Sequence, residues 1–225
     1  MGKIIIAVDD GHGIETAGKR TPDGYKENEF NHYTKEYLIE ELKYNGFKIV
    51  DVSPTREDNS LADRCNRAND GNADAFISIH FNAFTGTWQT KASGIETYYF
   101  PGSAAGKKLA TKVHAQLIKG TKQNNRGTKT ANFYVLKHTA MPAVLVECGF
   151  MDNKYEAALM KSTAFRKECS QEICKGICSY FGITYKEQTT KQYLVQAGFF
   201  NSLDNAKKLQ AQLVKDGYSA IIKEV

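Results

Sequence analysis

Two histidines and a glutamate stand where apolar, strand-like runs end. His12 follows the run 3–8 on a turn flanked by glycines, His80 ends the run 75–80, and Glu147 ends the fully apolar run 143–147. In open α/β sheets, ligands gather beyond the carboxyl ends of the strands. A carboxylate at the end of a buried run also needs a partner. These residue types at these places could hold or use a metal ion.

A catalytic zinc usually has a set of three protein ligands, often two histidines and a glutamate. The segment between the first strand and the first helix offers Glu15, Glu27 and Glu29 as the third ligand, and pattern alone barely separates them. We favour Glu27, because it precedes Asn28, a plausible helix N-cap, and would be left in the loop facing the sheet edge.

Strand and helix patterns alternate along most of the chain, which predicts an open, mostly parallel α/β sheet with helices on both faces. Gly46 is a plausible end of the first helix. We expect strands at residues 3–8, 47–52, 75–80, 95–100 and 143–147, and helices at residues 29–45, 61–69, 104–118 and 161–181.

The pattern changes near the C-terminus. Residues 184–191 are polar and without periodicity, which indicates a linker between a domain of residues 1–183 and a small unit of residues 192–225. Within the small unit we expect a strand at 193–198, a helix at 203–214 and a strand at 218–223. Such a βαβ unit is too short to form a core of its own and should need a partner.

The composition is that of a globular protein. The chain has 225 residues, a net charge of +5 and 41% apolar residues. No stretch reaches the length of a membrane span, and the short N-terminal apolar run does not resemble an export signal. We expect the five cysteines to be reduced, buried thiols. No run of like charges suggests a nucleic-acid partner.

Short motifs in a fixed order resemble those of the zinc-dependent N-acetylmuramoyl-L-alanine amidases, over the range from Ile4 to about Phe181. The matching segments are Asp9-Asp10-Gly11-His12-Gly13, Glu27-Asn28-Glu29-Phe30-Asn31, Ser78-Ile79-His80-Phe81-Asn82-Ala83, Gly94-Ile95-Glu96-Thr97-Tyr98-Tyr99 and Val146-Glu147-Cys148-Gly149-Phe150-Met151-Asp152-Asn153.

The resemblance implies a role for each candidate residue. His12, Glu27 and His80 would bind Zn²⁺, and Glu147 would be the catalytic glutamate. The substrate would be peptidoglycan, cut between N-acetylmuramic acid and L-alanine. Arg64 stands where the family often has arginine, and would contact either the substrate or a carboxylate; we favour the second. Trp88, the only tryptophan, could stack on a sugar or anchor its loop.

The C-terminal unit resembles half of a sporulation-related (SPOR) repeat, a module that binds peptidoglycan. The resemblance is carried by Tyr193-Leu194-Val195-Gln196-Ala197-Gly198-Phe199-Phe200, Ala206-Lys207-Lys208-Leu209 and Gly217-Tyr218. Because half a module leaves a sheet edge open, we expect two chains to pair these halves in a homodimer. The alternative is a βαβ appendage docked on the catalytic domain.

Other functions stay open at this point. The same ligands would serve a zinc peptidase that cuts the stem peptide, and a wall-binding protein without activity is the second alternative. Without an export signal, we expect synthesis in a bacterial cytoplasm and action on the wall after release through a pore or by lysis. An endolysin or an autolysin would fit that description.

Overall fold

The computed structural model describes residues 3–188, 196–218 and 220–224. The chain forms two compact units, Met1–Gln188 and Thr189–Val225, which are described separately. No helix in the described parts is both long and apolar enough to cross a membrane.

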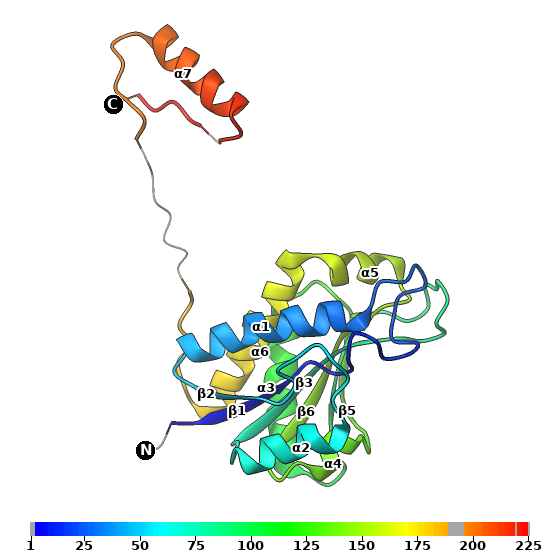
Figure 1. The fold of residues 1–225 in the computed structure, drawn as a ribbon. Helices are drawn as coiled ribbons and strands as arrows, with labels where there is room; N and C mark the ends of the chain where they lie inside the picture. Colours follow the sequence, from blue (N-terminus) through cyan, green and yellow to red (C-terminus); the bar gives the residue numbers. More distant parts are fainter. Residues whose placement is uncertain (1–2, 189–195, 219, 225) are drawn as a thin grey trace. The chain divides into compact units, whose positions relative to one another are not determined.

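A sheet of six strands forms the centre of the first unit, in the order β2-β1-β3-β6-β4-β5 (Figure 1). The β4–β6 pair is antiparallel and every other neighbouring pair is parallel, so β4 and β5 both run opposite to the other four strands. The prediction of an open, mostly parallel α/β sheet is confirmed. The strands are β1 (Ile5–Asp9), β2 (Lys48–Asp51), β3 (Ala75–Asn82), β4 (Ile95–Tyr99), β5 (Asn125–Thr130) and β6 (Ala143–Phe150).

Helices cover both faces of this sheet (Figure 1). The larger layer contains α1 (Glu27–Tyr44), α3 (Ala104–Gly120), α5 (Lys154–Lys161) and α6 (Thr163–Phe181). The opposite layer contains α2 (Leu61–Asp70) and the short α4 (Tyr134–His138).

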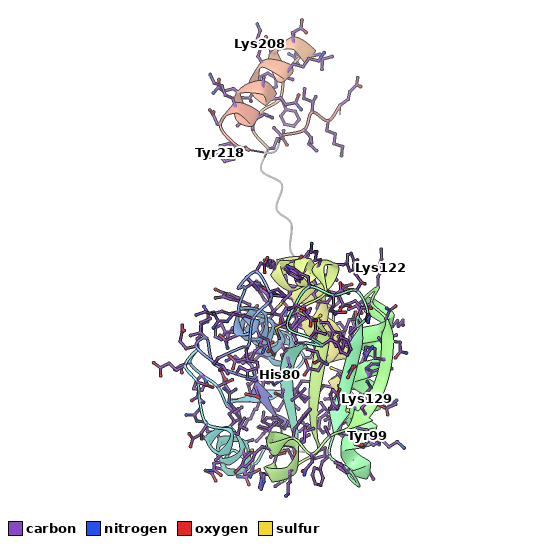
Figure 2. All side chains as sticks on the ribbon, turned by 90° about the vertical axis from the view of Figure 1, so that its right-hand side faces the viewer. His80, Tyr99, Lys122, Lys129, Lys208 and Tyr218 are labelled. Atoms are coloured by element: carbon purple, nitrogen blue, oxygen red, sulfur yellow. The ribbon has the colours of Figure 1, made fainter. Side chains whose placement is uncertain are left out.

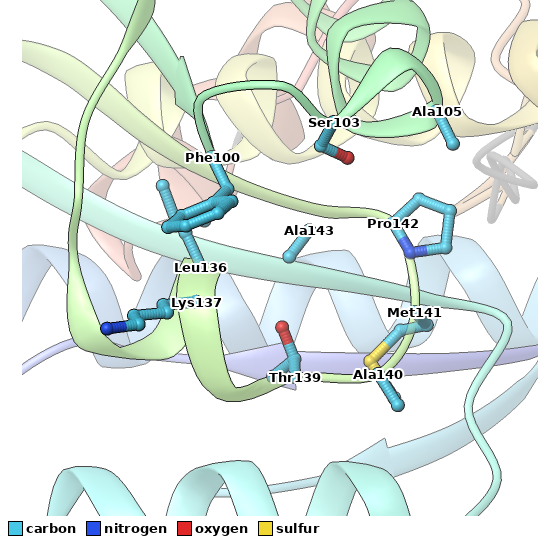
Figure 3. A pocket seen from close by; sticks show the side chains of 10 residues that line it. All are labelled: Phe100, Ser103, Ala105, Leu136, Lys137, Thr139, Ala140, Met141, Pro142 and Ala143. Atoms are coloured by element: carbon cyan, nitrogen blue, oxygen red, sulfur yellow. The ribbon is translucent and has the colours of Figure 1, made fainter.

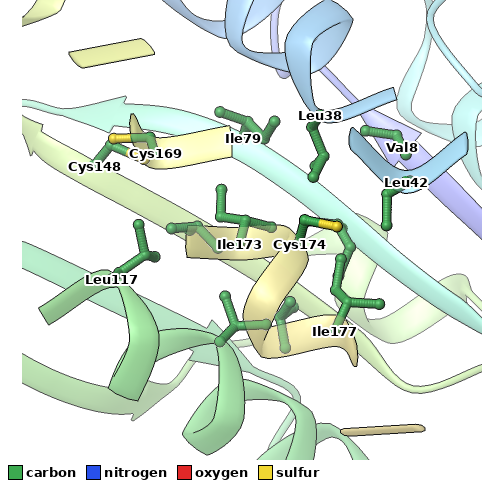
Figure 4. Packing of buried hydrophobic residues seen from close by; sticks show 14 of the residues in the cluster. Val8, Leu38, Leu42, Ile79, Leu117, Cys148, Cys169, Ile173, Cys174 and Ile177 are labelled. Carbon is green, nitrogen blue, oxygen red and sulfur yellow. The ribbon is translucent and has the colours of Figure 1, made fainter. Parts of the chain in front are cut away.

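Alternation along the strands divides the apolar side chains between two cores. Ile79 of β3 and Val146 of β6 face the larger layer, whereas Phe76 and Leu145 of the same strands face α2 and α4. In Figure 4, Ile79 lies among Leu38 of α1 and residues of α6. The five cysteines are free and buried, as predicted.

The same alternation decides where the polar residues of the strands lie. Asp9, His80, Glu147 and Glu96 are two or four residues from apolar positions that face the α2 and α4 layer, so they share that face. His80 pairs with Glu147 across β3 and β6, and Glu147 pairs with Glu96 across β6 and β4. The register therefore places these three side by side.

Some predicted boundaries are wrong. The helix expected at 161–181 is α6, which starts at Thr163 because the side chain of Ser162 accepts a hydrogen bond from the backbone N–H of Phe165 and caps the helix. The structure also has β5, α4 and α5, which were not predicted. The sequence of β5, Asn-Arg-Gly-Thr-Lys-Thr, is polar because this edge strand is largely accessible to solvent.

The start of α1 is another correction. The helix begins at Glu27, with Lys26 at the N-cap position, so Asn28 is not the cap and Glu27 is not in the loop. At the other end, Gly46 has a φ of +92° and follows the last helical turn, as expected for a helix stop.

The second unit contains α7 (Leu203–Lys215), close to the predicted helix. The strand expected at 218–223 is absent among the described residues 218 and 220–223, and no strand is present at residues 196–198. Residues 193–195 lie outside the described part. A strand needs a hydrogen-bonded neighbour, and the described residues of one βαβ half provide none. Two residues of the expected linker contact the first unit. The Tyr185 hydroxyl donates a hydrogen bond to Glu41 of α1, and the backbone N–H of Lys186 donates one to Asn45, the residue that follows α1.

Candidate active site

The loop after β1 brings His12 to the sheet edge through an unusual backbone. Gly11 and His12 both have positive φ angles, +37° and +56°. A Cβ at Gly11 would lie 2.2 Å from the His80 ring, and one at Gly13 would lie 2.4 Å from the backbone N of Asp58. Non-glycine residues with positive φ are concentrated at functional sites. Gly11 is therefore needed for the loop to approach His80, and Gly13 for the loop to pack on the backbone at Asp58.

His12, Glu27 and His80 converge at this edge, and each offers one ligand atom within 4.8 Å of the others. Glu27 Oε2 lies 3.6 Å from His12 Nε2, and Glu27 Oε1 lies 3.1 Å from His80 Nδ1. Tetrahedral ligands at zinc distances are separated by roughly 3.5 Å. The three side chains fit the donor set and the spacing of a zinc site.

The carboxylate of Glu27 is held before any metal binds. Its Oε1 accepts hydrogen bonds from the backbone N–H of Phe81 and from Asn31 Nδ2, both at 3.1 Å. Partners of this kind orient metal ligands in proteins. Both donors bond to Oε1. Oε2, the oxygen nearer to His12, accepts neither of these hydrogen bonds.

The charges of the site favour a cation. Burial alone would raise the pKa of Glu27, but the His80 hydrogen bond and both imidazoles lower it to about 2. Burial lowers the pKa of His12 to about 4, which leaves a neutral imidazole with a free lone pair. Burial also opposes a charge on His80, but the hydrogen bond to Glu27 raises its pKa. A metal cation would displace that proton.

Glu147 lies beside this group and differs from Glu27 in its environment. Its Oε2 is buried and has no hydrogen-bond partner among the described residues. Burial raises the pKa of Glu147 to about 8, with Glu27 adding to the rise and His80 opposing it. A carboxyl group with a pKa near neutrality can both accept and return a proton. Glu147, His12, Glu27 and His80 all line one cleft of about 330 Å³.

The rival glutamates do not reach the cleft. Glu15 is exposed and forms an ion pair with Lys26 at 2.7 Å, and Glu29 forms one with Arg56 at 2.6 Å. The structure therefore brings only Glu27 of the three candidates to the histidines.

Arg64 is buried beneath the loop that carries His12. Its guanidinium group pairs with Asp9, lies 3.5 Å from Asp10 Oδ1, and donates to the carbonyl oxygens of His12 and Asn59. The side chain is 1% exposed. Through these contacts Arg64 pairs with carboxylates and positions the loop. This is the role that we favoured from the sequence.

Sequence reasoning missed three residues around the site. Asn28 and Asn31 of α1 donate to the carbonyl oxygens of His12 and Gly11, each at 3.2 Å. Glu96, two residues into β4, accepts hydrogen bonds from Tyr98 and Lys129 and is 2% exposed. The only sequence signal for the two asparagines was their place in the 27–31 motif. Glu96 could be placed next to Glu147 only from the strand register. Figure 2 labels His80 and Lys129 on this sheet.

A second hollow, of about 250 Å³, lies near the start of β6 and the N-terminus of α3 (Figure 3). It contains none of the candidate residues and no acidic, histidine or cysteine side chain. Its lining residues are Phe100, Ser103, Ala105, Leu136, Lys137, Thr139, Ala140, Met141, Pro142 and Ala143. The cleft at His80 is therefore the candidate active site.

Comparison with known proteins agrees with this geometry. The family model of N-acetylmuramoyl-L-alanine amidase matches residues 6–179, and the SPOR domain model matches residues 179–225. The N-acetylmuramoyl-L-alanine amidase CwlM of Bacillus licheniformis is 34% identical over 97% of this chain and 84% of its own length. The sporulation-specific N-acetylmuramoyl-L-alanine amidase of Bacillus subtilis is 32% identical over 97% of this chain and 84% of its own length.

Solved structures lead to the same family. The crystal structure of an N-acetylmuramoyl-L-alanine amidase from Clostridium difficile 630 superposes with a TM-score of 0.76 and 29% identity, covering 81% of this chain and 98% of that one. Sequence and fold agree over the whole first unit. The chain belongs to the N-acetylmuramoyl-L-alanine amidase family, and its residues 179–225 match the SPOR domain.

Proposed function

We propose that this amidase is a zinc enzyme in which His12, Glu27 and His80 hold the ion and Glu147 is the catalytic acid and base. The observation that carries this proposal is the convergence of three ligand atoms within 4.8 Å at the edge of the cleft. When bound, zinc supplies a water of lowered pKa and a Lewis acid for the carbonyl oxygen.

The chain's own residues would move the proton. The bond to be cut joins the lactyl carbonyl of N-acetylmuramic acid to the nitrogen of L-alanine. Glu147 would accept a proton from the attacking water and deliver it to that nitrogen as the C–N bond breaks, so that the products are a carboxylic acid and an amine. The pKa of about 8 and the unpartnered Oε2 support this role.

Residues 1–183 would be the catalytic domain, residues 184–191 the linker, and residues 192–225 a wall-binding unit. In the second unit no residue of α7 is buried, and Phe199, Tyr218 and Ile221 are 78%, 66% and 77% exposed. Apolar surface of this extent is typical of an unpaired interface. We therefore propose that two chains pair these units in a homodimer.

Peptidoglycan would be the substrate, and the cell wall the place of action. The deciding experiment digests purified sacculi and analyses the products by mass spectrometry. We expect new L-alanine amino termini and intact glycan strands, loss of activity with a chelator, and recovery with zinc. New amino termini within the stem peptide would instead indicate a peptidase, and no solubilisation at all would indicate a wall-binding protein without activity.

A further inference from the structure

The loop that follows β3 starts at the cleft and displays two exposed aromatic side chains. Asn82 and Ala83 line the cleft, and the next residue, Phe84, is 58% exposed. Trp88, four residues further on, is 38% exposed. Neither ring belongs to either hydrophobic core of the first unit.

The first half of this loop is fixed by Asp152, a carboxylate that is 0% exposed. Its Oδ2 accepts hydrogen bonds from the backbone N–H groups of Phe84 at 2.8 Å, Thr85 at 2.7 Å and Gly86 at 3.0 Å. Three N–H donors on one buried oxygen define the backbone that carries Phe84. The ring is therefore exposed on an ordered loop.

The second half is fixed by Gln89. Its backbone N–H donates to the Asp152 carbonyl oxygen, and its side-chain Nε2 donates to Asp152 Oδ1, both at 3.0 Å. Gln89 Oε1 also accepts from the backbone N–H of Ala92 at 2.7 Å. Next to Gln89, the indole of Trp88 has the Lys154 ammonium 5.9 Å from its ring centroid. The position of Trp88 is thus set from both sides.

An ordered loop that keeps apolar rings in water has a cost in free energy, because burying them would be favourable. Exposed aromatic side chains on a fixed scaffold lose little conformational entropy when a ligand covers them. This property, on a loop whose first residues line the cleft, indicates a binding surface that continues the catalytic cleft.

We propose that Trp88 and Phe84 form a stacking site for pyranose rings of the glycan strand. The inference rests on the activity of the amidase on peptidoglycan. The bond to be cut is attached directly to a sugar of that strand, so neighbouring sugars must pass the rim of the cleft. The axial C–H groups of a pyranose give it an apolar face that packs on an aromatic ring.

An anionic wall polymer attracted by Lys154 is the competing ligand. It would be recognised by charge, so its binding would weaken steeply with salt. A neutral sugar ring that stacks on Trp88 needs no charge, so its binding would depend little on salt. Neutral oligomers of N-acetylglucosamine therefore separate the two cases.

Trp88 is the only tryptophan of the chain, so the tryptophan emission of the full-length protein reports on this loop alone. We expect oligomers of N-acetylglucosamine, and peptide-free glycan strands, to change this emission saturably and with little effect of salt. Phe84→Ala should weaken the apparent affinity by roughly three- to tenfold. Tyr44→Ala removes a ring that is 50% exposed at the far end of α1, and should leave the affinity unchanged.

The kinetic counterpart uses Trp88→Ala. We expect this variant to raise KM on sacculi, and Tyr44→Ala to leave KM unchanged. The inference is overturned if neither sugar probe changes the tryptophan emission, or if only an anionic polymer changes it. It is also overturned if Phe84→Ala and Tyr44→Ala have the same affinity for the sugar probes. The fluorescence titration needs neither metal nor turnover, so its failure is distinct from a failure of the proposed zinc mechanism.

Discussion

His80 of β3 and Glu147 of β6 are direct partners in the parallel register of the sheet. Both follow apolar positions of their strands, and both face the thinner layer of helices, where the cleft opens. One strand therefore contributes to the proposed metal site and its neighbour contributes the proposed catalytic carboxyl group. The sheet itself sets the spacing between them.

Replacement of Glu147 by Gln tests the proton transfer. The amide has nearly the same shape but cannot accept the proton, so we expect kcat to fall by about 10²- to 10⁴-fold. Zinc content and folding should be preserved, because the variant removes a carboxyl group whose Oε2 has no partner. Release of L-alanine amino groups from sacculi measures the rate. Glu15→Gln, at an exposed position, is the control; equal rates for both variants would remove Glu147 from the mechanism.

Arg64→Met separates the two roles considered for this residue. Loss of the guanidinium group leaves Asp9 and Asp10, which are 1% and 0% exposed, without that partner. Breaking a buried ion pair in this way typically costs about 3–5 kcal/mol. We expect chemical denaturation to show a loss of that size. A variant of normal stability with a raised KM would instead mean that Arg64 contacts substrate.

Much of this arrangement could be predicted from residue patterns. The buried strands β1, β3 and β6 are apolar runs, and the polar residues that interrupt or follow them indicated the site. The expected strand ends were wrong, because β3 continues to Asn82 beyond His80 and β6 continues to Phe150 beyond Glu147. The elements β5, α4 and α5 could not be found in this way, because β5 is a polar edge strand, α4 has only five residues and α5 only eight.

The third ligand shows a different limit. From the residue pattern alone, the choice of Glu27 over Glu29 rested on a helix cap at Asn28, and that cap does not exist; only the resemblance to the family indicated Glu27 independently. Glu27 faces the histidines from the first turn of α1, whereas Glu29 turns toward Arg56. Which glutamate faces inward depends on the helix phase relative to the sheet, and local sequence does not determine this.

Stability at low pH should depend on Asp152. Burial alone would raise its pKa, but the backbone N–H groups of the 84–86 segment and Gln89 lower it below the ordinary value of 3.8. Between the folded and unfolded pKa values the unfolded chain binds more protons, so stability rises with pH. The advantage is complete above the unfolded pKa and is lost as pH falls through the folded one.

The measurement compares free energies of unfolding of the wild type and Asp152→Asn across acidic pH. Their difference should be constant near neutrality and shrink as pH falls through the depressed pKa. Asp70→Asn, at an exposed position of α2, should show no such change. A difference for Asp152→Asn that stays constant down to the lowest usable pH would contradict the assignment.

The second unit should control the association state. If two units pair through their apolar side chains, light scattering at micromolar concentration should give the mass of a dimer. Ile221→Asp places a charge on a residue that is 77% exposed and should give monomers, whereas Lys208→Gln on α7 should not. A wild-type monomer that still binds sacculi tightly would argue against pairing.

The zinc content of purified protein tests the central claim most directly, with Glu27→Gln and Glu29→Gln as a matched pair. The two glutamates are in the first turn of the same helix, and only Glu27 approaches His12 and His80. We predict about one zinc ion per chain in the wild type and in Glu29→Gln, and at least a tenfold loss of affinity in Glu27→Gln. Full zinc occupancy in Glu27→Gln, or a wild-type protein that takes up no metal, would contradict the account.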